Sequence, residues 1–148
     1  MKDPNVEALN KRTRMDTVCS FVFAGVFAFT AVGKLLMHSA GQAVGNLFLC
    51  VIFLLTGLIF TDIRRHGKPF AMSVIWKLRV LAVTVMCSGF LSDFAESFAR
   101  SKALAEPLEL NLDDQFIIVT ALLGVIIGIL SEIFVYGHAL QDDMDQIA

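Results

Sequence analysis

The chain has 148 residues, of which 56% are hydrophobic and 18% are charged, with a net charge of −2 at pH 7 and a mean hydropathy of +0.70. Soluble domains carry about 25% charged residues, so this composition is typical of an integral membrane protein and argues against a water-soluble one. It contains no long basic face and no nucleic-acid-binding motif, so direct binding of nucleic acid is not expected. The length fits a single domain, residues 1–148.

Four apolar segments follow one another along the chain, at about residues 17–36, 45–61, 78–98 and 116–136. A helix needs about 20 residues to cross the hydrocarbon core. The first and fourth segments meet that length, the second is short, and the third has an uncharged stretch of only Val80 to Ser92. Because backbone amides in lipid need partners within the segment, the sequence predicts an all-α, four-helix transmembrane bundle with both termini on one side.

The cations are distributed unevenly between the two ends of the predicted spans. Nine of the twelve lie in the N-terminal tail or in the connection between the second and third spans, and the others are Lys34, Arg100 and Lys102. The positive-inside rule therefore places both termini and that connection in the cytoplasm. The first apolar run is longer than the core of a signal peptide, so we expect it to remain as a span. The apolar runs and the distribution of the cations together predict a multi-pass protein of the cytoplasmic (inner) membrane, whose first partner is the lipid bilayer.

Three charged residues lie toward the outer ends of the predicted spans. Lys34 lies near the outer end of the first span, and Asp93 and Glu96 lie three residues apart on one face of the third. Because these two spans run in the same direction, the charges reach a similar depth. They either form an ion pair across the bundle or extend separately to the headgroups. The same charges support an alternative function, a small transporter or channel.

Two further features lie on the predicted fourth span. Glu132 is at its inner end and Arg79 at the inner start of the third span, so the two can meet at the cytoplasmic interface. Gly124 and Gly128 form a GxxxG motif, which favours close helix packing. This motif has two interpretations, packing within one bundle and homo-oligomer formation.

No residue pattern predicts catalysis. The chain has no nucleophile elbow, zinc-protease motif, P-loop or dinucleotide fingerprint. His38, His66 and His138 have neither a helical partner nor a cysteine or carboxylate cluster beside them. We therefore expect no enzyme activity, and we predict no catalytic, cofactor-binding or metal-binding residue.

The connection between the second and third spans contains the stretch HGKPF. Gly67 permits a turn, Pro69 is suited to the first turn of a helix, and Phe70 is expected in the headgroup boundary. On the same predicted side, the tail after Gly137 is acidic. A basic connection and an acidic tail either close a cap on the bundle or dock a soluble partner, and the residues do not choose between these.

Two stretches, GKPF…LR and LSEIFVYGHALQDDMD, together resemble the DUF2975 family of small four-span bacterial membrane proteins. Val74, Met144 and Gln146 depart from the family pattern, so the chain resembles a divergent member. The resemblance implies a bacterial protein without established activity, and it suggests a small helix-turn-helix regulator as the membrane protein's partner. The residues that carry it, and that we expect to serve a partner or the structure, are Gly67, Pro69, Phe70, Arg79, Glu132, Gly137, Asp142 and Asp143.

These observations favour a small non-enzymatic membrane protein. We expect a sensor, regulator or scaffold that presents the basic cytoplasmic loop and the acidic C-terminal tail to a partner. The alternative, a small transporter or channel, would use Lys34, Asp93 and Glu96.

Overall fold

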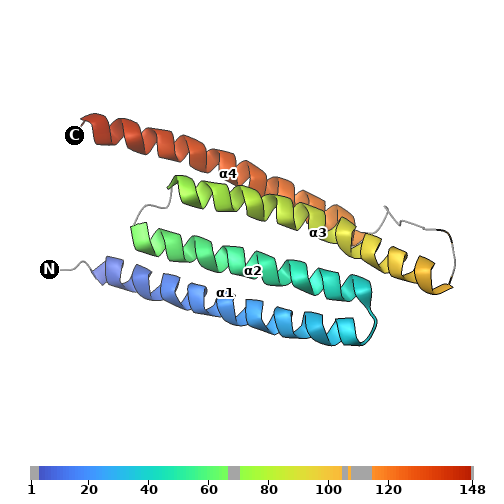
Figure 1. Ribbon diagram of the computed structural model, residues 1–148. Helices are drawn as coiled ribbons and strands as arrows, with labels where there is room; N and C mark the ends of the chain where they lie inside the picture. The colour runs from blue at the N-terminus through green and yellow to red at the C-terminus, as the bar shows by residue number, and fades with distance from the viewer. Residues whose placement is uncertain (1–3, 67–70, 105–106, 108–114, 148) are drawn as a thin grey trace.

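The computed structural model consists of four long helices, α1 (Pro4–Leu36), α2 (Ala40–His66), α3 (Met72–Leu104) and α4 (Gln115–Ile147) (Figure 1). The structure describes residues 4–66, 71–104, 107 and 115–147, and all regular structure within these ranges is α-helical. Each helix contains a stretch that is long and apolar enough to cross a membrane. The prediction of an all-α fold with four membrane-spanning helices is therefore confirmed.

The helices are longer than the predicted spans. α1, α3 and α4 have 33 residues each, which corresponds to about 50 Å at 1.5 Å per residue. The hydrocarbon core is only about 30 Å thick, so each of these helices extends well beyond it. Lys11, Arg12 and Arg14 thus lie in a helical continuation of the first span, and the acidic tail lies in a continuation of the fourth.

The four helices lie side by side in chain order, α1 on α2, α2 on α3, and α3 on α4 (Figure 1). Within the described residues, helices that are not neighbours in the chain have no Cα atoms within 8 Å of each other. Both termini lie at the end of the array where α2 leads into α3, as an even number of spans requires. The side of the membrane that this end faces stays a prediction.

The tight turn between α1 and α2 is a Schellman motif, which satisfies carbonyls at a helix end. The amide of Ser39 donates to the carbonyl of Lys34 and the amide of His38 to that of Leu35, both at 3.1 Å. His38 has a φ of 59°, in the left-handed region that glycine adopts at little cost. The turn is short enough to make α1 and α2 antiparallel neighbours.

Most large apolar side chains point outward from the array. Phe29 is 81% exposed and Leu36 75% exposed, whereas Val74 and Ile75 are fully buried between the helices. A continuous apolar exterior of this extent is unfavourable in water and is the surface expected against lipid. The arrangement fits a small multi-pass integral membrane protein.

Aromatic side chains and glycines set the contact between α1 and α2. The rings of Phe23 and Phe27 both stack on Phe53 of α2, with centroids 5.3 and 5.5 Å apart. One turn further along α2, the ring of Phe21 packs over Gly57, where a Cβ atom would lie 3.2 Å from it. The absence of a side chain at Gly57 thus lets α1 approach α2 closely.

The contact between α3 and α4 also depends on small residues. A Cβ atom on Gly124 would lie 2.7 Å from Cβ of Met86 and 2.8 Å from the carbonyl oxygen of Ala82, whereas one on Gly128 would meet nothing within 4 Å. Gly124 therefore packs within the chain, as one interpretation of the GxxxG motif expects. Gly128 does not take part in this contact, so a role in homo-oligomer formation stays a hypothesis.

Candidate functional site

A cavity of about 860 Å³ lies along α3, between α2 and α4. It forms because α2 and α4 both pack on α3, while the described Cα atoms of α2 and α4 stay more than 8 Å apart. α1 contributes a single lining residue, Lys34. The cavity is therefore a direct consequence of the serial helix order, since a closed bundle would fill this space with side chains.

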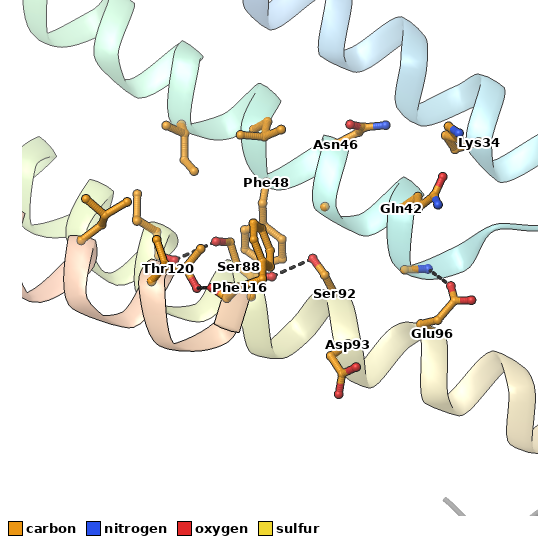
Figure 2. Close-up of a pocket in the computed structure, with 18 of the residues that line it drawn as sticks. Lys34, Gln42, Asn46, Phe48, Ser88, Ser92, Asp93, Glu96, Phe116 and Thr120 are labelled. Carbon is orange, nitrogen blue, oxygen red and sulfur yellow. Dashed lines mark hydrogen bonds between the residues drawn. The ribbon is translucent and has the colours of Figure 1, made fainter. Parts of the chain in front are cut away.

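The cavity has a polar end and an apolar end (Figure 2). The polar end, near the α1–α2 turn, is lined by Lys34, Gln42, Asn46, Asp93, Glu96 and Arg100. The apolar end lies deeper between the helices and is lined chiefly by Phe48, Leu49, Ile52, Val85, Leu123 and Ile127. A cavity with this division is suited to an amphiphilic ligand, because apolar walls bind the chain while a few polar groups fix its orientation.

Glu96 holds the polar end together. Its Oε2 accepts a hydrogen bond from the backbone amide of Gly41 at 2.9 Å, in the first turn of α2 (Figure 2). The carboxylate thereby caps an unpaired amide and lies at the positive end of the α2 dipole. Its Oε1 accepts longer contacts of 3.4 Å from Arg100, one helical turn away.

Close approach at Gly41 makes this cap possible. A Cβ atom there would lie 2.6 Å from Cβ of Glu96 and 2.8 Å from the carbonyl oxygen of Ser92. Gly45 is also close to Ser92, with its would-be Cβ 3.3 Å from Oγ. Gly41 and Gly45 thus form a second small-residue pair, at the start of α2, that brings α2 onto α3.

Of the two alternatives for Lys34 and the carboxylates of the third span, the ion pair does not form. Because α2 lies between α1 and α3, Glu96 is bound by Gly41 and Arg100 instead. Within the described part of the chain, the side chains of Lys34 and Asp93 make neither an ion pair nor a hydrogen bond. All three predicted intramembrane charges nevertheless line the same cavity.

Two ion pairs lie toward the opposite end of α3. Arg79 Nη2 is 2.8 Å from Glu132 Oε1, which joins α3 to α4 and confirms the predicted contact. Lys77 pairs with Asp62, which joins α3 to α2, and both of these side chains are largely buried. The same short segment of α3 therefore binds both of its neighbours through charge.

Two further predicted residues, Gly137 and Asp143, do not line the cavity. Gly137 is half-buried in α4 and Asp143 is exposed near its end. Asp142 also lies in α4, but its side chain is outside the described part of the structure. The residues of the turn, Gly67, Pro69 and Phe70, lie outside the described residues as well.

Neither metal ligands nor disulfides are evident in the described ranges. No group of three or more His, Cys, Asp or Glu side chains there is placed to hold a metal ion. The three cysteines, Cys19, Cys50 and Cys87, are free. The cavity lining provides charged groups, side-chain amides and apolar walls.

Comparisons of the chain with protein families, curated proteins and solved structures give no match. The resemblance to the DUF2975 family stays a prediction.

Sequence reasoning overlooked several residues of these sites. Asp62 lies two residues before Arg64 and Arg65, at the start of a strongly basic stretch, which hid its role as a partner of Lys77. The stretch AGQAVG at the start of α2 carries Gly41 and Gly45 at helical spacing with Gln42 between them. This second small-xxx-small motif, with the side-chain amide of Gln42 inside it, was the sequence pattern that could have predicted the polar end of the cavity.

Proposed function

We propose that this protein is a small non-enzymatic membrane sensor or regulator whose ligand-binding element is the cavity between α2, α3 and α4. The observation that carries the proposal is the division of that cavity into a charged end and an apolar end, built on a helix that also makes the Lys77–Asp62 and Arg79–Glu132 ion pairs. The output surface would be the opposite end, with the basic turn and the acidic end of α4.

The two ends are connected through α3. At the cavity, α2 and α4 are separated by the space that a ligand would fill, whereas at the other end Lys77 and Arg79 hold them to α3. A ligand that spreads α2 from α4 changes the inclination of both helices about these ion pairs. Rigid helices carry such a change along their length when packed interfaces have alternative arrangements.

A soluble partner at the output end is the second part of the proposal. The resemblance to the DUF2975 family suggests a small helix-turn-helix regulator, and Arg64, Arg65 and Asp143 are exposed to bind one. We place this end in the cytoplasm of a bacterial cell, because the positive-inside rule favours that orientation.

Affinity capture of the full chain from native membranes tests this function. We expect a partner to copurify with the wild-type protein and to be lost with Asp143→Asn or with Arg64→Gln combined with Arg65→Gln. A cavity-filling Leu123→Phe should change the amount captured, while Leu122→Phe, whose side chain is exposed and does not line the cavity, should not. Capture of the same proteins by all variants would contradict a regulatory role.

A transporter is the second candidate, because Lys34, Asp93 and Glu96 line one cavity. Ionisable residues at membrane depth often mark ion or substrate pathways. Flux measured in proteoliposomes separates the two functions. The transporter is favoured, and the sensor is overturned, if the wild-type protein shows flux, Asp93→Asn removes that flux and Asp143→Asn leaves it unchanged.

A further inference from the structure

Five exposed cations lie together at the end of the array that carries both termini. Lys11, Arg12 and Arg14 are near the start of α1, and Arg64 and Arg65 are near the end of α2. Because α1 and α2 are antiparallel neighbours, these two helix ends lie side by side (Figure 1). The positive charges therefore gather on one pair of helices.

The register of the α1–α2 contact places two of these arginines opposite each other. The ring of Phe21 packs over Gly57. On α1, Arg14 lies seven residues before Phe21, and on α2, Arg64 lies seven residues after Gly57. Seven residues are close to two helical turns, so each arginine lies on the face of its helix that makes this contact. Helices in contact are about 8–10 Å apart, so both guanidinium groups can reach one phosphate between them.

No carboxylate compensates this pair of arginines within the ranges that the structure describes. There, the side chains of Arg14 and Arg64 make neither an ion pair nor a hydrogen bond. Asp16 is exposed and makes no ion pair with them, and Asp62 is paired with Lys77. Two like charges held close repel each other, and an anion between them replaces repulsion by attraction. A phosphate suits this position, because it accepts paired hydrogen bonds from a guanidinium group.

The depth of the two arginines matches the headgroup layer. With the tight turn between Leu36 and Ala40 at one boundary of the hydrocarbon core, the opposite boundary lies about 30 Å away. Counted along α1 from Leu36, Arg14 lies about 3 Å beyond that boundary. Counted along α2 from Ala40, Arg64 lies about 6 Å beyond it. The headgroup layer is about 5–8 Å deep on each side, so lipid phosphates are concentrated at the depth of this pair.

We propose that Arg14 and Arg64 together bind the phosphate of an anionic phospholipid, in the leaflet at the end where α2 leads into α3. An anionic headgroup is favoured over a zwitterionic one, because Lys11, Arg12 and Arg65 are close by and repel an ammonium group. This inference goes beyond the proposed function. The lipid site does not involve the cavity, and Arg14 is not among the residues assigned to a soluble partner.

Lipid retention measured by native mass spectrometry tests the inference on the full chain. The protein is exchanged into micelles that contain equal amounts of phosphatidylglycerol and phosphatidylcholine with identical acyl chains. One cation near an anionic lipid contributes a factor of about five to binding. For two arginines we therefore expect wild-type protein to prefer phosphatidylglycerol by about 25-fold. Equal retention of the two lipids overturns the inference and leaves the arginines to a soluble partner.

Matched variants assign the lipid to the two arginines. Arg14→Gln and Arg64→Gln should each lower the preference by about fivefold. Arg12→Gln removes the same charge at the same end, but Arg12 lies two residues from Arg14 and so about 200° away around α1. Its effect should be smaller, and Lys102→Gln, near the other end of α3, should have none. If Arg12→Gln lowers the preference as much as Arg14→Gln does, the cations act only as diffuse surface charge and the assigned site is overturned.

Inorganic phosphate separates a lipid site from a site for a free anion. Added at constant ionic strength, it should leave phosphatidylglycerol bound, because the acyl chains hold the lipid at the protein surface. Displacement of the lipid by inorganic phosphate overturns the lipid assignment. The wild-type preference is measured without any variant, so a misfolded variant does not remove the test.

This experiment fails separately from the test of function. A protein that prefers phosphatidylglycerol but captures no partner overturns the sensor and keeps the lipid site. A protein that captures a partner without any lipid preference keeps the sensor and overturns the lipid site.

Discussion

Substitution of Gly124 by alanine directly tests the close packing of α3 and α4. The added Cβ would lie 2.7 Å from Cβ of Met86, 2.8 Å from the carbonyl oxygen of Ala82 and 2.9 Å from the amide nitrogen of Met86. Two of these atoms belong to the backbone, so no side-chain rotation relieves the contact, and α4 must move away from α3. Overpacking of this kind costs about 1–3 kcal/mol.

Gly128→Ala is the matched control on the same helix. An added Cβ meets nothing within 4 Å there, and replacement of a mid-helix glycine by alanine stabilises by about 0.5–1 kcal/mol. Both variants gain this helix propensity, so their difference isolates the packing cost. We expect Gly124→Ala to be less stable than Gly128→Ala by about 1–3 kcal/mol.

The assay is reversible unfolding in mixed micelles, followed by circular dichroism as the SDS fraction increases. If the two variants unfold at the same SDS fraction, Gly124 does not lie against α3 and the helix order is wrong. If only Gly128→Ala changes the oligomeric state, the GxxxG motif serves association between copies instead.

Three further substitutions test separate contacts by the same unfolding assay. His38→Gly should stabilise by about 1 kcal/mol because it relieves the left-handed conformation at the α1–α2 turn, and a loss of stability would contradict the Schellman geometry. Asp62→Asn should destabilise by about 1–3 kcal/mol because it leaves Lys77 largely buried without its charge partner, and Lys77→Met in the same chain should recover part of the loss. Glu96→Ala should destabilise by about 1–3 kcal/mol, because it removes the acceptor of the Gly41 amide. Glu96→Gln retains an acceptor oxygen and should cost less. Equal losses of stability in the two variants would exclude the capping role.

The parts of the fold that could be predicted from the sequence are those that depend on composition and on local sequence pattern. Four apolar runs were sufficient for four helices, because lipid requires every backbone amide to be paired within its own segment. The contact between Arg79 and Glu132 was also predictable, since both residues lie toward the same end of helices that follow one another in the chain.

The missed contacts depend on how the helices are ordered around one another. Equal depth allowed a pair between Lys34 and the carboxylates of Asp93 or Glu96 as one of two alternatives, but depth does not reveal that α2 lies between α1 and α3. The cap that Glu96 places on Gly41 joins residues 55 positions apart, and it exists only because two glycine positions let α2 approach α3. The cavity itself results from a contact that α2 and α4 do not make, which no local pattern encodes.

The coupling between the cavity and the opposite end is tested most directly by a distance measurement across the output end. The native cysteines are replaced by serine, and nitroxides are attached through Arg64→Cys on α2 and Asp143→Cys on α4. Double electron–electron resonance then measures the distance between the two nitroxides in nanodiscs. We expect Leu123→Trp, which fills the cavity, to shift the distance distribution, and Leu122→Trp to leave it as in the parent chain. Identical distributions in all three proteins would show that the cavity and the output end are independent, and would contradict the proposed sensor.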